Sequence, residues 1–427
     1  MTRVEPAGAL RGAVAVPGDK SISHRGLLLG AVAEGETVVR GLLRAGDTES
    51  TIDALRALGV AIEDAGDAVT VRGAGLRGLA EPADPVDCGN AGTLVRLVAG
   101  LLAGQAGRRF ELTGDESLRS RPMERVAEPL RRLGAGVETT AGRLPLRIEG
   151  RSLEGIEYAL PVASAQVKSC VLLAGLYASG RTTVLEPLPT RDHTERMLRA
   201  AGARVEARPG RITVWPAERL SPLSIDVPGD FSAAAPLIAA ATIVPGSELV
   251  LAGVGVNPTR TGFLHVLERM GARIQLFNRR TVGGEPVADI DVRHAELTAT
   301  GIAPGEVPLL VDELPLFALV SAVAHGDSEV RGAQELRAKE TDRIETVTTG
   351  LRRLGVHIAP RDDGFAVRGV PSRPRGGSMT SGGDHRIAML GAVAGLASRE
   401  GVQIEDAEAV AISFPGFFEL LEGISVR

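Results

Sequence analysis

The sequence predicts an α/β (α+β) protein made of two similar lobes, each built from three βαβαββ repeat units around buried helices. Two observations lead to this prediction. A phrase related to Leu-Arg-x-Leu-Gly recurs six times at intervals of about 70 residues, a spacing that suits a small α/β unit. The turn Val-Pro-Gly-Asp occurs twice, at residues 16–19 and 227–230, as if the chain restarts there. A chain of 427 residues is also too long for one compact core.

Each copy of the repeated phrase has the features of a helix end. Its glycine occupies the position that follows a helix, and the next residues alternate as strands do, as at residues 60–62, 203–205 and 272–274. The glycines of the six copies are Gly59, Gly134, Gly202, Gly271, Gly355 and, in a degenerate copy, Gly423.

The units also begin alike, with a polar turn that runs into a helix of Ala, Leu and Val. Such helices are apolar nearly all round, which is typical of buried helices. They are expected at residues 27–33, 94–103, 171–177, 233–243, 316–324 and 387–397. A strand follows, as at residues 36–40 and 182–185. Three units on each side of about residue 230 suggest two lobes with a cleft between them, where small ligands usually bind.

Composition excludes several classes of protein. A formal net charge of −5 argues against a general nucleic-acid-binding surface, so any anion site must be a local concentration of cations. Cys88 and Cys170 lack metal or redox spacing and are expected to be buried. The N-terminus has no apolar signal core, and no apolar run approaches about 18 residues. We therefore expect a cytoplasmic protein that binds neither nucleic acid nor membrane.

The segment of residues 16–25 combines a strand end, a Pro-Gly turn and a helix start. This geometry directs free backbone N–H groups at one point, where Lys20 adds a charge and Ser21 a hydroxyl. Arg25 lies one helical turn after Ser21, on the same face. The alternative is an ordinary capped helix with solvated basic residues. The second Val-Pro-Gly-Asp turn continues without lysine or arginine, which favours an anion site in the first.

Lysine is rare in this chain. Of 48 basic residues only Lys20, Lys168 and Lys339 are lysines. A compact ammonium can do what a planar guanidinium cannot, so its retention favours a specific role. Lys20 and Lys339 both lie in strongly charged motifs.

Other units open with polar turns that also suit an anionic ligand. Glycines at residues 89 and 92 allow close backbone approach, and the next loop supplies Arg121. Helical spacing predicts that Lys339 and Arg343 share one helix face, with Glu340 near Arg343. Each turn also has an ordinary explanation: Asp312 fits a helix cap, and residues 339–343 fit an exposed face of ion pairs. The remaining polar turns lie at residues 163–168, 190–194 and 383–386.

Several known site types are missing from the sequence. The order Gly-Lys-Ser of a phosphate loop is absent, as are a dinucleotide fingerprint, a metal-spaced cluster and a serine elbow. We therefore expect a cation-rich site without metal or cofactor, in which Asp312 and Glu340 are candidates for proton transfer.

The motifs of the polar turns resemble those of 5-enolpyruvylshikimate-3-phosphate synthase, in order and over the whole chain. The segments at residues 165–169 and 191–195 resemble the branch often called class II. In that fold the N-terminal strand joins the C-terminal lobe, so we expect a first lobe at residues 20–229 and a second at residues 1–19 and 230–427. The matching motifs are Pro-Gly-Asp-Lys-Ser-Ile-Ser-His-Arg at 17–25, Gly-Asn-Ala-Gly-Thr at 89–93, Arg-Pro at 121–122, Ser-Ala-Gln at 164–166, Lys-Glu-Thr-Asp-Arg at 339–343 and Asp-His-Arg at 384–386.

The resemblance implies transfer of the enolpyruvyl group of phosphoenolpyruvate to the 5-hydroxyl of shikimate 3-phosphate, with release of phosphate, by a monomeric enzyme. Asp312, Glu340 and Lys20 would handle protons. Phosphoenolpyruvate would be bound by Lys20, Gly92, Arg121, Gln166, Arg343 and Arg386. Shikimate 3-phosphate would be bound by Lys20, Ser21, Arg25, Ser164, Ala165, Gln166, Arg191, Asp312 and Lys339. Both lobes would be lined with like positive charges and stay apart until a ligand bridges them.

Two features bear on how phosphoenolpyruvate is held. Many family members carry a lysine near the C-terminus where this chain has Ile412. This branch therefore either binds phosphoenolpyruvate with one cation fewer or binds it in a somewhat different way. Gly92 leaves space that a methyl group would fill, so we expect sensitivity to glyphosate.

Two other functions fit parts of the sequence. UDP-N-acetylglucosamine enolpyruvyl transferase shares the fold and the donor. Its usual reactive cysteine lies on a mobile loop, whereas Cys88 and Cys170 of this chain flank expected helix starts. Six repeats could also form a non-catalytic anion-binding scaffold.

Overall fold

The computed structural model describes residues 1–426 and divides into two compact units. We call the unit of residues 18–227 and 281–285 the first lobe, and the unit of residues 1–17, 228–280 and 286 onward the second lobe. These divisions lie two residues from the expected boundaries. The sequence analysis did not anticipate that the short stretch 281–285 groups with the first lobe.

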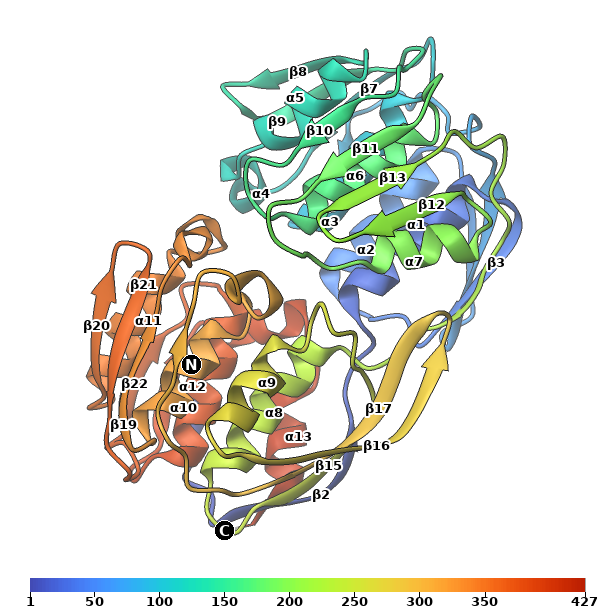
Figure 1. The fold of residues 1–427 in the computed structure, drawn as a ribbon. Coiled ribbons are helices and arrows are strands. Elements are labelled where there is room, and N and C mark those ends of the chain that lie inside the picture. The colour runs from blue at the N-terminus through green and yellow to red at the C-terminus, as the bar shows by residue number, and fades with distance from the viewer. Residues whose placement is uncertain (427) are drawn as a thin grey trace. The chain divides into compact units, whose positions relative to one another are not determined.

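The first lobe contains three copies of one unit, each with a four-stranded sheet (Figure 1). The first two strands in each sheet order are parallel and the others antiparallel. The first copy contains α1 (Lys20–Val32), β3 (Glu34–Arg40), α2 (Gly46–Ala57), β4 (Ala61–Asp64), β5 (Ala68–Ala74) and β14 (Ser224–Asp226). The second contains β6 (Val86–Asp87), α3 (Gly92–Ala103), β7 (Arg109–Thr113), α4 (Glu116–Ser120), α5 (Glu124–Arg132), β8 (Gly136–Thr140) and β9 (Arg143–Glu149). The third contains β10 (Glu157–Ala159), α6 (Ala165–Gly175), β11 (Thr182–Leu185), α7 (His193–Ala200), β12 (Val205–Arg208) and β13 (Arg211–Val214).

The second lobe repeats the plan with more variation. Its first copy contains β2 (Ala9–Ala15), α8 (Phe231–Ile243), β15 (Glu248–Gly255), α9 (Gly262–Arg269), β16 (Arg273–Val282) and β17 (Glu285–Arg293). The next contains β18 (Gly301–Ile302), η1 (Val307–Leu309), α10 (Leu314–Ala322), β19 (Gly326–Val330), η2 (Gln334–Ala338), α11 (Arg343–Arg353), β20 (His357–Arg361) and β21 (Gly364–Gly369). The last contains β1 (Thr2–Val4), β22 (Gly377–Thr380), α12 (His385–Ala397), β23 (Val402–Glu405), η3 (Ala407–Ile412), α13 (Phe417–Ile424) and β24 (Ser425–Val426).

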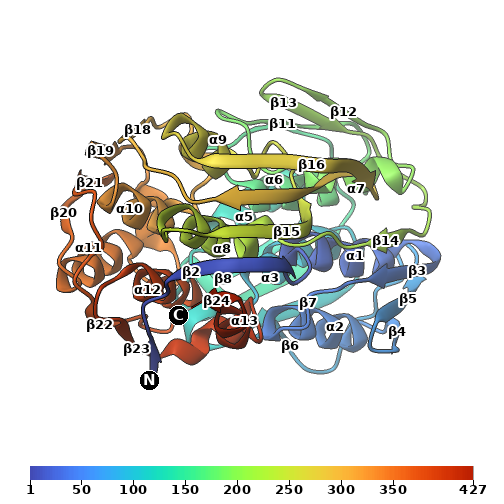
Figure 2. The same cartoon turned by 90° about the horizontal axis from the view of Figure 1, so that it is seen from below.

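Each Val-Pro-Gly-Asp turn is preceded by a strand that belongs to one lobe and is followed by a helix that belongs to the other. β14 comes just before the second half but pairs with β3 of the first lobe, where Ile225 lies opposite Val39. β2 comes from the N-terminus but pairs with β15 of the second lobe, where Val14 lies opposite Leu251 (Figure 2). The N-terminal strand therefore belongs to the second lobe, as the resemblance implies.

Each lobe has its own hydrophobic core, and its central helices are buried on nearly all faces. In the first lobe α3 packs closely against α6. A methyl group at Gly100 would lie 2.4 Å from the carbonyl oxygen of Cys170, so only glycine permits this approach. The prediction of buried repeat helices is thus confirmed. No helix within residues 1–426 combines the length and apolar character needed to cross a membrane.

Candidate active site

Three buried helices of the first lobe begin at predicted site residues. Lys20, Gly92 and Ala165 are the first residues of α1, α3 and α6. The side chain of Gln166 links two of these starts, since its Nε2 donates to Thr93 Oγ1 at 3.0 Å. The N-terminus of a helix presents unpaired N–H groups and a partial positive charge. The fold therefore gives this part of the lobe an affinity for anions before any charged side chain is counted.

Lys20 is held at the helix start by local geometry. The Asp19 carboxylate caps α1 by accepting a hydrogen bond from the backbone N–H of Ile22 at 2.9 Å. The Lys20 ammonium lies 3.0 Å from Oδ2 of Asp47 in the first turn of α2, and the two side chains are 22% and 11% exposed. The predicted strand, turn and helix start at this segment are all present.

Gly92 lies beneath two guanidinium groups. A methyl group on its Cα would be 2.9 Å from Nη1 of Arg96 and 3.0 Å from Nη1 of Arg121. Arg121 donates to the Asn90 side-chain oxygen at 2.5 Å, and Arg96 donates to the Gln166 side-chain oxygen at 2.6 Å. The two arginines are thus fixed close to the start of α3.

Sequence reasoning missed Arg96. It is 7% exposed and is the one charged residue in the apolar segment Gly-Thr-Leu-Val-Arg-Leu-Val-Ala-Gly-Leu-Leu-Ala of α3. A charge on an all-apolar helix, one turn after a glycine, is the signal that could have identified it.

Arg25 is 4% exposed, and its guanidinium bonds to protein groups. Its Nε donates to Thr194 Oγ1 at 2.7 Å, its Nη1 to the Ser21 carbonyl oxygen at 2.9 Å and its Nη2 to Ser169 Oγ at 3.0 Å. Burial lowers the pKa of Arg25 to about 10, and Glu195 opposes this shift, so the side chain stays charged at neutral pH. Arg191, on the loop between β11 and α7, contributes to the same lowering.

Ser164 and Ala165 form the start of α6. Ser164 Oγ caps the helix, accepting from the Val167 N–H at 3.4 Å. Capping uses one lone pair of the Ser164 hydroxyl and leaves its O–H group to donate to shikimate 3-phosphate, as the resemblance implies.

The second lobe is organised around Arg343, whose side chain is 1% exposed. Its Nε lies 2.8 Å from Asp384 Oδ2, its Nη2 2.6 Å from Glu340 Oε2 and its Nη1 3.4 Å from Asp312 Oδ1. Burial alone lowers the pKa of Arg343, but these carboxylates outweigh it and hold the pKa above its usual value. For Asp384 the directions are reversed. Burial alone would raise the pKa of this carboxylate, but the charge of Arg343 outweighs burial and lowers the pKa.

Asp312 connects the remaining cations to this centre. It lies in the turn before α10, with its side chain 12% exposed. Lys339 Nζ is 3.8 Å from its Oδ1, and Arg386 Nη2 is 3.5 Å from its Oδ2. Five of the residues predicted for the site therefore form one network: Asp312, Lys339, Glu340, Arg343 and Arg386.

Glu313, the neighbour of Asp312, is a further member of this region that sequence reasoning did not assign to the site. Its carboxylate is buried, accepts a hydrogen bond from Ser232 Oγ at 2.5 Å and lies 3.7 Å from Arg386 Nη1. Burial raises the pKa of Glu313, although Arg386 opposes the shift.

Two expectations for the second lobe are wrong. Residues 339–342 are not helical, because Asp342 caps α11 by accepting from the N–H groups of Ile344 and Glu345, and the helix begins at Arg343. Lys339 and Arg343 meet at Asp312 through tertiary contacts instead of helical spacing. The lining is also not uniformly positive, since carboxylates of Asp312, Glu313, Glu340 and Asp384 accompany the cations.

Ile412, the departure from the family pattern, is the last residue of η3 and is partly buried. Within residues 1–426 no group of three or more His, Cys, Asp or Glu side chains is arranged to hold a metal ion.

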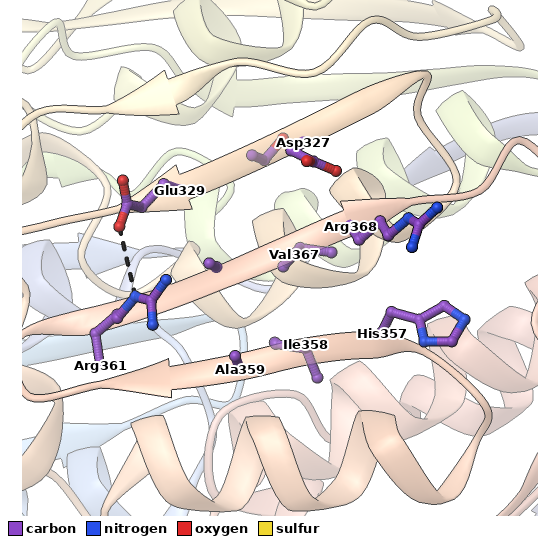
Figure 3. Close-up of a pocket in the computed structure, with 10 residues that line it drawn as sticks. Asp327, Glu329, His357, Ile358, Ala359, Arg361, Val367 and Arg368 are labelled. Carbon is purple, nitrogen blue, oxygen red and sulfur yellow. Dashed lines mark ion pairs between the residues drawn. The ribbon is translucent and has the colours of Figure 1, made fainter.

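A pocket elsewhere contains none of the predicted site residues. It lies on the exposed face of the sheet formed by β19, β21 and β20, where Arg361 forms an ion pair with Glu329 at 3.6 Å (Figure 3). Asp327, His357 and Arg368 project from the same strands. These alternating exposed side chains are those of a solvated sheet face.

Comparisons with known proteins cover the whole chain. The family model of EPSP synthase (3-phosphoshikimate 1-carboxyvinyltransferase) matches residues 4–421. A 3-phosphoshikimate 1-carboxyvinyltransferase of Citrifermentans bemidjiense is 52% identical over 427 residues, 99% of each chain. The structure of EPSP synthase from Acinetobacter baumannii matches with a TM-score of 0.89 and 44% identity, covering 100% of this chain and 98% of that one. The enolpyruvyl transferase NikO from Streptomyces tendae shares the fold at 19% identity, with a TM-score of 0.77 over 99% of this chain and 96% of that one.

Proposed function

This chain belongs to the EPSP synthase family, and from that premise we propose that its two charged clusters bind and activate the substrates of the family's reaction. The enzyme transfers the carboxyvinyl group of phosphoenolpyruvate to the 5-hydroxyl of shikimate 3-phosphate and releases phosphate. This reaction belongs to the shikimate pathway of aromatic amino acid biosynthesis. The observation that carries the assignment of residues is that Lys20, Gly92 and Ala165 each begin a buried helix of one lobe, with Gln166 bonded to Thr93 in the first turn of α3.

The first-lobe cluster is proposed to hold the anionic groups of the substrates. Lys20, Gly92, Arg121 and Gln166 contribute to the phosphoenolpyruvate site, and Arg96 joins them because it holds Gln166. Arginine suits this role because its planar donors match carboxylate and phosphate oxygens. Shikimate 3-phosphate is proposed to contact Lys20, Ser21, Arg25, Ser164, Ala165, Gln166 and Arg191.

The second-lobe cluster is proposed to move protons. As the 5-hydroxyl oxygen attacks C2 of phosphoenolpyruvate, Asp312 takes the hydroxyl proton, and the methylene carbon gains a proton from Glu340 or Lys20. Loss of a proton from that carbon then expels phosphate and restores the double bond. Lys339, Arg343 and Arg386 surround Asp312 and would steady negative charge during these steps. Arg343 and Arg386 are also assigned to phosphoenolpyruvate, and Asp312 and Lys339 to shikimate 3-phosphate.

The cysteines disfavour the sugar-nucleotide enzyme as an alternative. Cys88 and Cys170 are both fully buried. Burial raises the pKa of each thiol, to about 12 for Cys170, so neither offers a reactive thiolate at neutral pH.

A phosphate-release assay tests the function directly. Phosphate should appear only when the enzyme receives phosphoenolpyruvate together with shikimate 3-phosphate. Release with UDP-N-acetylglucosamine in place of shikimate 3-phosphate would instead identify the alternative enzyme, and no release with either acceptor would identify a binding scaffold.

We also propose that the enzyme works as a monomer in the cytoplasm. Both cysteines are free thiols, as is usual in a reducing compartment, and the monomer is what the family resemblance implies. Light scattering on the purified protein should give the mass of one 44.4 kDa chain, and the mass of a dimer would contradict this.

A further inference from the structure

Lys168, the third lysine of the chain, has no role in the proposed reaction and is fully buried. It lies on α6, two residues after Gln166. Its Nζ is 2.8 Å from Glu195 Oε1 and 3.1 Å from Glu186 Oε2, and it donates to the Thr190 carbonyl oxygen at 3.3 Å. The ammonium therefore joins α6 to the loop at residues 186–192 and to the first turn of α7.

That loop carries Arg191, and it is tied on both sides of this residue. Before Arg191, Thr190 Oγ1 donates to Glu186 Oε2 at 2.8 Å. After it, Arg196 Nε donates to Asp192 Oδ1 at 2.8 Å, and His193 Nδ1 lies 2.8 Å from Glu285 Oε1. Lys168 bonds directly to the carbonyl of the residue before Arg191, which fixes the backbone from which the Arg191 side chain extends.

The same framework also supports Arg25. Ser169, next to Lys168, and Thr194, next to Glu195, accept hydrogen bonds from the Arg25 guanidinium. Two cations assigned to shikimate 3-phosphate are therefore held by neighbouring residues of α6 and α7.

The geometry around the Lys168 ammonium suits a lysine better than an arginine. Two oxygens from the loop at residues 186–192 and one from α7 converge on one nitrogen, which a tetrahedral ammonium matches and a longer planar guanidinium does not. A buried ion pair adds little to stability compared with well-packed apolar residues, so what this one contributes is the fixed position of the groups that it joins.

We propose that Lys168 is a positioning residue that holds Arg191 in place for the phosphate of shikimate 3-phosphate. The proposal rests on the proposed function, because it assumes that Arg191 binds this substrate. It predicts an effect on one substrate and not on the other, which general loss of stability would not produce.

The test is the steady-state kinetics of Lys168→Met. We expect the KM for shikimate 3-phosphate to rise about tenfold, while kcat and the KM for phosphoenolpyruvate change less than about threefold. In an Arg191→Ala background the same substitution should raise the KM for shikimate 3-phosphate by less than about twofold, because the positioned group is gone. An unchanged KM for shikimate 3-phosphate, an equal rise for both substrates, or additive effects of the two substitutions would overturn the proposal.

Control variants distinguish an effect on the position of Arg191 from a general loss of protein stability. Tyr177→Phe removes a buried polar group from the same lobe, where its hydroxyl lies 3.4 Å from Gln105 Nε2, and should leave both KM values unchanged. If Lys168→Met does not fold, Lys168→Met/Glu195→Gln removes one charge of each sign, and the same selective rise is expected. Absence of phosphate release by the unmodified enzyme would reject the proposed function itself, a result distinct from any of these.

Discussion

The two charged clusters are built on different electrostatic plans. In the first lobe, Arg96 and Arg121 flank a glycine at a helix start, and both bond to neutral amide oxygens. In the second lobe, Arg343 is surrounded by the carboxylates of Asp312, Glu340 and Asp384. The arginines beside Gly92 are thus held by amide oxygens, whereas the central arginine of the second cluster is held by carboxylates.

This difference teaches how two clusters of one protein can contribute in different proportions to anion binding and to proton transfer. An anion site is favoured where cations lie beside helix starts, because these present unpaired backbone N–H groups and a partial positive charge. A proton-transfer site needs carboxylates kept in fixed positions, and buried guanidinium groups provide that. We therefore expect substitutions in the second cluster to act mainly on kcat, and those in the first to act also on substrate affinity.

The largest effect is expected for Asp312→Asn. The amide keeps the size of the side chain but cannot take a proton, so kcat should fall about a thousandfold, whereas the KM for shikimate 3-phosphate, which Asp312 is also proposed to contact, should change far less. Steady-state kinetics with each substrate varied in turn measures this. Asp327→Asn, on the sheet face of Figure 3, is the matched control and should behave as wild type. A rise in KM with kcat preserved would remove the distinction between the clusters.

Lys20→Arg should lower kcat/KM for phosphoenolpyruvate about a hundredfold, although the charge is kept. Lys20 begins α1, and its ammonium lies 3.0 Å from the Asp47 carboxylate. A longer, planar guanidinium would move the positive charge away from this position. Arg72→Lys is the reverse exchange at the surface and should have no effect, because the Arg72 side chain is 61% exposed and pairs there with Glu36. Turnover like that of wild type in Lys20→Arg would refute the argument from rare lysines.

Gly92→Ala should weaken inhibition by glyphosate about tenfold and raise the KM for phosphoenolpyruvate by a smaller factor. The added methyl would lie 2.9 Å and 3.0 Å from the guanidinium nitrogens of Arg96 and Arg121 and would push them from the anion site. Gly46→Ala is the matched control, because Gly46 is also the first residue of a helix and a methyl there meets no atom within 4 Å. Identical inhibition curves for wild type and Gly92→Ala would contradict this.

The smallest effect is expected for Glu313→Gln, measured by calorimetry as the melting temperature against pH. The folded pKa of Glu313 is raised above its unfolded value of about 4.3, so the bound proton favours the folded state most at low pH. That contribution is lost as pH rises through the folded pKa. The amide mimics the protonated form, so the variant should melt higher than wild type at pH 8.

The gain in melting temperature should shrink toward pH 4, where wild-type Glu313 is itself protonated. Glu63→Gln, at a 72% exposed side chain, should show no such trend. A gain in melting temperature for Glu313→Gln that stays constant with pH would show that burial does not raise the pKa of Glu313.

Local signals predicted much of the fold. The turn at Pro17 and Gly18 predicted the start of α1, and the structure adds that Asp19 caps it; both features depend on residues within one turn of the chain. The repeated glycine after each helix revealed the units for the same reason. At residues 339–343 a local argument failed, since the cap at Asp342 sets the helix start and the spacing of charges does not.

Sequence alone thus determined the repeat units, the buried helices and the segments in which Lys20, Asp312 and Arg343 lie, because turns, caps and apolar periodicity are properties of neighbouring residues. Only the tertiary structure decided which groups meet. It placed Arg96 and Arg121 over Gly92, gave Arg343 its three carboxylates and surrounded Lys168 with Glu186 and Glu195. These contacts join residues far apart in the chain, and their strength depends on burial that no local pattern records.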